Sequence, residues 1–314
     1  MQKNPEISVN ISVYNGQEYL DESIQSILNQ TFEDFECIIV DDGSTDRTSE
    51  ILSYWEEKDK RVKVLHNPKN MGRPLSRNRA ITVSKGSLIA VMDADDYAFP
   101  ERLEKQFHLM HKNPEIQASG AAMLVYENDK RMTPRETNDE IRARLLFDCA
   151  IFHPTAIIRK SFLLSHKIWY DLSLLTAQDY GLWTDFLPHH DGIFYNLNDQ
   201  LIRYRMHFSK NRDEHKNSQN KNANKVRVKI LRYLGLPTTK ENVNLHLALC
   251  LGNASFFGVS IDDCVRWSEQ LIKKNLQVKL VNPKMLENYI MERIENILNY
   301  NELKKVLLDK YSYK

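Results

Sequence analysis

Cysteine, glycine and proline are scarce in this sequence of 314 residues, which contains four, ten and ten of them. The cysteines, Cys37, Cys149, Cys250 and Cys264, lie far apart and form no CxxC pair. We therefore expect neither a zinc site nor a disulfide framework in a chain of this length. Reduced thiols, as in a cytoplasmic protein, are the expectation.

Neither sign of charge is in excess, because 43 Lys and Arg residues stand against 42 Asp and Glu residues. A nucleic-acid surface needs a basic excess, so we expect no nucleic-acid partner. Long apolar runs are missing too. Residues 242–261 carry no Asp, Glu, Lys or Arg, but Asn244 and His246 help to make them too polar for a membrane span. The N-terminus lacks the apolar run of a signal peptide. We expect a soluble protein.

The glycine-rich motifs that commonly hold phosphate groups are absent as well. The sequence contains no GxGxxG, no GxxxxGKS or GxxxxGKT, and no GxSxG. A chain with so few glycines needs another device to bind a phosphorylated ligand. A divalent metal ion held by carboxylates is such a device, because Mg²⁺ commonly bridges protein carboxylates and substrate phosphates.

The first part of the chain alternates between patterns typical of strands and patterns typical of helices. Apolar or alternating runs predict strands at residues 7–13, 35–40, 61–66 and 87–92, and apolar residues at helical spacing follow each of them. This order predicts an α/β fold with a mostly parallel sheet flanked by helices. In such sheets, ligands bind at the carboxyl ends of the strands.

The remainder of the chain has a mixed pattern. It predicts a strand at residues 118–126, a helix at 138–147, and a hairpin of residues 193–197 and 201–207. Residues 209–225 contain no large apolar side chain, which favours a mobile loop or linker. Beyond that segment the periodicity is mostly helical.

Polar or acidic clusters follow three of the predicted strands: Tyr14 and Asn15, Asp41 and Asp42, and Asp93–Asp96. One pair of carboxylates in a loop is most simply a solvated turn. Three clusters at the same edge of one sheet indicate a ligand site instead. Asp93 and Asp95 follow an apolar strand at positions i and i+2, so both side chains can point into one crevice. Their oxygens suit Mg²⁺ or Mn²⁺.

Seven segments together resemble the family 2 glycosyltransferases, which have the GT-A fold. These are ISVNISVYNG, DDGSTD after FECIIV, NMGRPLSRNRAI, SLIAVMDADD, HPTAIIRKS, AQDYGLW and YRMHFSKN. The resemblance covers about residues 5–211. It implies a GT-A (Rossmann-like) catalytic domain at residues 1–211. We then expect a flexible linker or lid at residues 212–225 and a helical C-terminal region at residues 226–314.

The resemblance implies that five residues bind the nucleotide of a nucleotide-sugar. Asp42 is similar to the acid that hydrogen-bonds the uracil of a UDP-sugar. Tyr14 and Asn15 would lie near the base, with Asp41 close by. Arg77, in the SRN segment, would lie beside the nucleotide or its phosphates.

Four further residues match positions that the family uses for the ribose, the metal and catalysis. Asp93 is similar to the first acid of the DXD motif, near the ribose. Asp95 is similar to the ligand of the divalent metal, and His207 would approach the metal or the phosphates. Asp179, in AQDYGLW, matches the general base.

The resemblance also implies a mechanism. The charge of the leaving diphosphate is neutralised by Mn²⁺ or Mg²⁺ acting as a Lewis acid, and Asp179 takes the proton of the acceptor hydroxyl. One base and an in-line displacement predict inversion at the anomeric carbon. Two positions depart from the family pattern. Ser12 stands in place of a common proline, and Gln178 in place of a common glutamate.

Two other functions stay open at this point. A sugar-1-phosphate nucleotidyltransferase shares the sheet and the use of a metal, but it normally needs a glycine-rich loop where residues 14–17 stand. A nucleotide-sugar-binding protein without turnover would not need Asp179 as a base. A glycosyltransferase is the function that we favour.

The expected partners are a nucleotide-sugar donor, with UDP as the expected nucleotide, and a glycan or lipid-linked acceptor in the synthesis of a surface polysaccharide or another glycoconjugate. The C-terminal region carries the basic residues Lys273, Lys274, Lys279 and Lys284. They leave two hypotheses open. One is peripheral contact with the inner face of the membrane. The other, which we favour, is a packed appendage or an oligomer contact.

Overall fold

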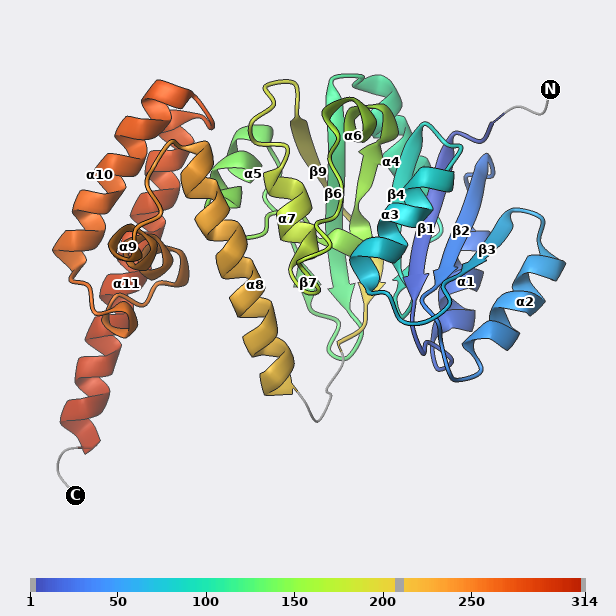
Figure 1. Cartoon of the computed structure of the whole chain (residues 1–314), viewed down its shortest axis with the longest axis horizontal. Helices are drawn as coiled ribbons and strands as arrows, with labels where there is room; N and C mark the ends of the chain where they lie inside the picture. Colours follow the sequence, from blue (N-terminus) through green and yellow to red (C-terminus); the bar gives the residue numbers. More distant parts are fainter. Residues whose placement is uncertain (1–3, 207–211, 312–314) are drawn as a thin grey trace.

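A mixed sheet forms the centre of the molecule (Figure 1). The computed structural model describes residues 4–206 and 212–311. In this part of the chain the strands are β1 Ile7–Val13, β2 Phe35–Asp41, β3 Val62–His66, β4 Leu88–Asp93, β5 Tyr97–Ala98, β6 Ile116–Val125, β7 Arg131–Met132, β8 Ile157–Arg159 and β9 Ile193–Tyr204. Their order across the sheet is β3-β2-β1-β4-β8-β6-β9-β5, and β7 pairs with β6.

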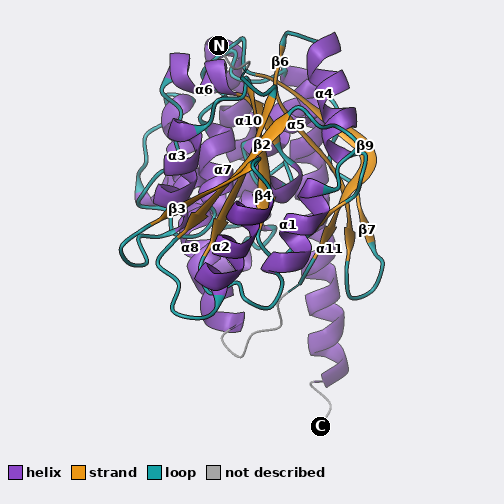
Figure 2. Cartoon of the chain, turned by 90° about the vertical axis from the view of Figure 1, so that its right-hand side faces the viewer, coloured by secondary structure: helices purple, strands orange, loops and turns teal. Residues whose placement is uncertain are grey.

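Helices pack on both faces of this sheet (Figure 2). They are α1 Leu20–Leu28, α2 Thr48–Lys58, α3 Arg73–Val83, α4 Arg102–Lys112, α5 Asn138–Leu145, α6 Lys160–His166, α7 Gln178–Thr184, α8 Arg212–Tyr233, α9 Lys240–Leu251, α10 Ile261–Val278 and α11 Pro283–Tyr311, with short 3₁₀ helices η1 His153–Thr155 and η2 Ser255–Phe257. Because successive side chains of a strand point to opposite faces, β2 contributes to two cores. Cys37 and Ile39 share a core with α1, whereas Ile38 and Val40 pack with Ala80 of α3.

The α/β fold predicted from the sequence is confirmed. Strands β1, β2, β3 and β4 pair in parallel, as the alternation of strands and helices predicts. Pairing becomes antiparallel where β8 joins β4 and β6, so the sheet is mixed and only in large part parallel. The parallel strands place their carboxyl ends at one edge, which is where the predicted acidic clusters begin.

The predicted hairpin of residues 193–197 and 201–207 is wrong. A single strand, β9, runs through this segment and pairs in parallel with β6. Leu197 pairs with Ala121 and Gln200 with Ala122, so Asn198 and Asp199 are extra residues at a register shift. The polar residues that resemble a turn therefore form a bulge, which bends a strand without reversing it.

The predicted loop at residues 209–225 is wrong for the described residues, because helix α8 begins at Arg212. The role of residues 212–225 as a linker or lid stays a prediction. The C-terminal half of α8 buries Val226 and Ile230 in the main core. Residues 216–221 of the same helix are exposed. A helical segment that faces solvent needs no apolar periodicity, so its composition resembles that of a loop.

The C-terminal helices share one hydrophobic core with the α/β region. This core contains Trp183 and Phe186 near α7 together with Leu249 of α9 and Trp267 of α10. Helix α10 packs against α9 and α11, as expected for a packed appendage. In the part of the chain that the structure describes, no helix has both the length and the apolarity to cross a membrane. The boundaries of the predicted domains and the hypothesis of membrane contact stay predictions.

A buried arginine, Arg142, connects the α/β region to the C-terminal helices through hydrogen bonds. The guanidinium of Arg142 on α5 donates hydrogen bonds to the backbone oxygens of Leu187 (2.6 Å), Gly192 (3.0 Å) and Leu280 (2.8 Å). We expect Arg142→Met to lower the free energy of unfolding by about 3 kcal/mol, because the buried carbonyl oxygens would lose a charged donor. Urea unfolding followed by circular dichroism measures this loss.

Arg144→Met is the matched control on the same helix. Its ion pair with Asp148 is long, at 3.8 Å, and both side chains are partly exposed, so we expect a loss below about 1 kcal/mol. If both variants lost the same free energy of unfolding, the hydrogen bonds of Arg142 would not be what stabilises the contact between the α/β region and the C-terminal helices.

Candidate functional site

A cavity of about 570 Å³ opens where β1, β2 and β4 end. Its size lies within the range of ligand pockets. The residues that line it come from the loops after these strands, from the loop before α3 and from the loop before α7. Among them are Tyr14, Asn15, Asp42, Asp93 and Asp95, which the sequence singles out, and Tyr19, Asn70, Arg73, Leu175 and Thr176, which it does not.

The loop after β1 is held against the loop after β2. The backbone N–H of Asn15 donates to Ser44 Oγ (2.9 Å), and the backbone N–H of Thr45 donates to Asn15 Oδ1 (2.8 Å). Asn15 has a φ of 53°, a left-handed conformation that Asn adopts more readily than most residues. Beside it, the ring of Tyr14 is 46% exposed and lines the cavity. The first two predicted clusters therefore meet here.

Asp42 organises the loop that precedes α3. Its Oδ1 accepts hydrogen bonds from Asn67 Nδ2 (2.7 Å) and from the backbone N–H of Met71 (2.9 Å). Its Oδ2 accepts one from the backbone N–H of Gly72 (2.8 Å). The carboxylate thus shapes one wall of the cavity, and a contact with a nucleotide base stays a prediction.

Asp41 does not line the cavity, although it is adjacent to Asp42. Its carboxylate accepts hydrogen bonds from the backbone N–H of Ser44 (2.9 Å) and from Ser49 Oγ (2.8 Å), and it pairs with His66 Nδ1 at 3.2 Å. Burial raises the pKa of Asp41, but these hydrogen bonds outweigh it and hold the pKa below its usual value. Asp41 stabilises the turn after β2.

Arg77 lies behind Asp93 and is not part of the cavity wall. Its Nη2 donates to Asp93 Oδ1 at 2.7 Å, and its guanidinium lies 5.5 Å from the centre of the Tyr170 ring. Burial raises the pKa of Asp93, but the positive charge of Arg77 more than offsets this, so the pKa is lowered. Asp93 is therefore a fixed carboxylate at the floor of the site.

Arg205 holds the Asp95–Asp96 turn in place. Its Nε donates to the backbone oxygen of Asp95 (3.0 Å), and its backbone N–H donates to Asp96 Oδ1 (2.8 Å). Burial and the neighbouring carboxylates of Asp93 and Asp95 raise the pKa of Asp96 to about 9, so this acid is neutral at pH 7. The sequence analysis missed Arg205, although it lies two residues before His207 in the YRMH segment.

Asp179 lies in the first turn of α7, just after the cavity-lining loop that contains Leu175 and Thr176. Burial raises its pKa above the usual value of an aspartate, against the opposing effects of a backbone hydrogen bond and the charge of Arg77. The Sγ atom of Cys149 lies 3.8 Å from Asp179 Oδ2. A carboxylate with a raised pKa beside a pocket has the chemistry of a general base.

The donor atoms of the site fit a divalent metal that is shared with a phosphorylated ligand. Asp95 supplies carboxylate oxygens at the cavity wall, and Mg²⁺ is commonly held by one or two carboxylates together with substrate phosphates. Among the described residues, no group of three or more His, Cys, Asp or Glu side chains could hold a metal ion by itself. The other predicted ligand, His207, lies outside the described residues.

A Rossmann-like sheet with carboxylates gathered at the ends of its parallel strands fits the GT-A fold of glycosyltransferases. The sequence profile described as "Glycosyl transferase family 2" matches residues 8–169, and the chain belongs to that family. An uncharacterized glycosyltransferase of Haemophilus influenzae is 32% identical over 74% of this chain and 75% of its own. The O-antigen biosynthesis glycosyltransferase WbnJ of Escherichia coli is 34% identical over 64% of this chain and 80% of its own.

Solved structures agree with this fold. S. aureus TarS 1-349 in complex with UDP-GlcNAc has a TM-score of 0.62 and 21% identity, over 93% of this chain and 89% of that chain. The mannosyltransferase PcManGT of Pyrobaculum calidifontis, in complex with GDP-Man and Mn²⁺, has a TM-score of 0.55 and 14% identity over 94% and 88%. The predicted GT-A fold and family are confirmed. A glycosyltransferase is thus supported over the nucleotidyltransferase and the binding protein without turnover.

Proposed function

We propose that this chain transfers a sugar from a UDP-sugar to a hydroxyl group of a glycan or lipid-linked acceptor, with inversion, in the synthesis of a surface polysaccharide or another glycoconjugate. The observation that carries this proposal is the cavity in which Asp42, after β2, meets Asp93 and Asp95, at the end of β4, with Asp179 just beyond its wall. The likeness to TarS, solved with UDP-GlcNAc, supports a UDP-linked donor.

The donor would lie along the cavity with its base near Tyr14, Asn15 and Asp42 and its ribose near Asp93. Asp95, with His207 as a second ligand, would hold Mn²⁺ or Mg²⁺ on the diphosphate. The bound ion would neutralise the charge of the leaving group. The likeness to PcManGT, solved with Mn²⁺, supports this assignment.

Asp179 would take the proton of the acceptor hydroxyl as that oxygen attacks the anomeric carbon. A general base must be deprotonated yet basic enough to accept a proton, so a raised pKa improves an aspartate in this role. With one base and no carboxylate nucleophile, the attack occurs on the face opposite the leaving group. This geometry gives a product of inverted configuration.

A panel of donors tests the proposal. Purified protein is incubated with UDP-glucose, UDP-galactose, UDP-GlcNAc or GDP-mannose and a glycan acceptor, with Mn²⁺, with Mg²⁺ or with EDTA, and nucleotide release is measured. We expect release from a UDP-sugar only when a metal is present, and a newly formed product of opposite anomeric configuration by NMR. Equal release in EDTA would contradict metal dependence, and a retained configuration would contradict the single-base mechanism.

A further inference from the structure

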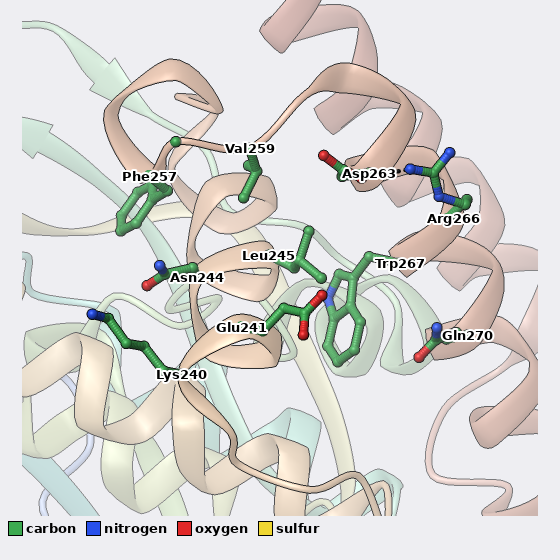
Figure 3. A pocket seen from close by; sticks show the side chains of 11 residues that line it. Lys240, Glu241, Asn244, Leu245, Phe257, Val259, Asp263, Arg266, Trp267 and Gln270 are labelled. Atoms are coloured by element: carbon green, nitrogen blue, oxygen red, sulfur yellow. Dashed lines mark hydrogen bonds and ion pairs between the residues drawn. The ribbon is translucent and has the colours of Figure 1, made fainter.

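A second cavity, also of about 570 Å³, lies among the C-terminal helices (Figure 3). Helix α9, the loop after η2, and α10 form its walls. In Figure 1, α9 and α10 lie on the far side of α8 from β1, β2 and β4, whose ends form the first cavity. The second cavity is therefore separate from the proposed donor site, although its size is equally suited to a ligand.

Polar side chains without partners line this cavity. The side chains of Glu241, Asn244 and Gln270 form no hydrogen bond or ion pair with another described residue. Trp267 is only 1% exposed, and its Nε1 has no hydrogen-bond partner among the residues that the structure describes. In Figure 3 the indole nitrogen is on the ring edge turned toward α9. A buried N–H without an acceptor calls for a ligand or a water molecule at that place.

The charges around the cavity are balanced. Lys240 and Arg266 stand against Glu241 and Asp263, and Arg266 Nη2 pairs with Asp263 Oδ1 at 2.5 Å. A phosphate or a nucleic acid would need an excess of positive charge, which the cavity does not offer. The balance favours a ligand without net charge that both donates and accepts hydrogen bonds.

Apolar side chains complete the wall. Leu245, Phe257 and Val259 lie between the polar groups and are partly buried. Acid and amide side chains can bind hydroxyl groups, and apolar side chains can cover the C–H faces of a sugar ring. Of the ligands without net charge, a saccharide matches this combination of groups.

We propose that the second cavity binds a neutral saccharide segment of the acceptor or product glycan. The inference rests on the proposed function in that a glycan is the acceptor. Holding one part of a glycan at the C-terminal helices raises the effective concentration of the rest of that molecule at the same enzyme. The Glu241 carboxylate accepts hydrogen bonds from the sugar hydroxyls, and the Gln270 amide both donates and accepts them.

Titration calorimetry on the full chain tests this proposal with neutral tetrasaccharides of glucose, galactose and N-acetylglucosamine, each with and without UDP and Mn²⁺. We expect at least one probe to bind in both conditions. Glu241→Ala and Gln270→Ala should each weaken it about five- to tenfold, as expected for the loss of one hydrogen bond. Gln277→Ala is the matched control, because Gln277 is exposed on α10 and outside the cavity lining.

Three results would overturn the proposal. One is the absence of binding by every probe at about 10 mM. Another is equal affinity for the wild type and for Glu241→Ala/Gln270→Ala. A third is self-association in sedimentation that this double variant abolishes, because the cavity would then belong to a second copy of the chain. A UDP-induced melting shift, measured on the same samples, reports on the donor site separately. A normal shift without saccharide binding overturns this inference alone.

Discussion

Asp179→Asn is expected to lower the rate of sugar transfer by about 10³-fold while leaving nucleotide binding unchanged. The amide has nearly the shape of the carboxylate, but it does not accept the proton that the acceptor hydroxyl must lose, and general-base catalysis contributes about 10²- to 10⁴-fold. Transfer is measured as product formation, and binding as the melting shift with UDP and Mn²⁺. Retained binding with lost transfer is the result expected of an enzyme. Unchanged transfer would exclude Asp179 as the base.

The raised pKa of Asp179 fixes the direction of the pH dependence. The base acts when deprotonated, so kcat/KM should fall as the pH falls through this raised pKa and should level off above it. The same shift means that the folded protein binds this proton more tightly than the unfolded chain. Ionisation of Asp179 therefore costs stability as the pH rises above about 4, the usual pKa of an aspartate. Asp179→Asn should consequently not lower the melting temperature at pH 7.

Gln178→Glu is a useful comparison next to the base, because it restores the acid that is common in the family. Gln178 is 5% exposed, and its Oε1 has no hydrogen-bond partner within the described part of the chain. A second carboxylate here would raise the pKa of Asp179 further by repulsion. We expect the fall of kcat/KM to begin at a higher pH than in the wild type. An unchanged profile would indicate that Asp179 is not the group that titrates.

The sequence predicts the parallel half of the sheet well for a physical reason. Strands such as β4 are buried on both faces, so their apolar runs are long, and polar turn residues mark their ends. The same logic places Asp42, Asp93 and Asp95 at one edge, where the structure brings them into one cavity. The sequence pattern predicts the positions of these residues because β1, β2 and β4 are parallel neighbours, so residues that follow each strand lie at the same edge of the sheet.

The remaining parts of the site depend on contacts between distant residues. Neighbours in sequence such as Asp41 and Asp42 look equivalent, yet only Asp42 lines the cavity, since Asp41 is used within its own turn. Arg205 reaches the Asp95–Asp96 turn across 110 positions of sequence. Helix α8 resembles a loop in composition because its residues 216–221 are exposed. No local pattern contains this information.

Asp95→Asn is expected to remove most of the metal-dependent stabilisation by UDP and to slow sugar transfer by about 10²- to 10³-fold. An amide has no negative charge to hold a divalent ion, and loss of the ion leaves the charge of the diphosphate without compensation. For the wild type, UDP at about 100 times its Kd should add about 2.7 kcal/mol of stability, which is a melting shift of about 4 °C in a chain of this size. Scanning calorimetry with UDP, GDP, CDP and dTDP, with and without Mn²⁺, measures the shift.

Asp262→Asn provides the matched control for this variant. Asp262 is exposed on α10 and lies outside the cavity lining, and its substitution by Asn removes one negative charge, as Asp95→Asn does. The melting shift of Asp262→Asn with UDP and Mn²⁺ should therefore equal that of the wild type. Because the shift is a difference between two scans of one variant, a change in basal stability cancels. A full shift in Asp95→Asn would assign the metal to other ligands. A shift that is equal with and without Mn²⁺ in the wild type would mean that the protein binds the nucleotide through its own side chains alone.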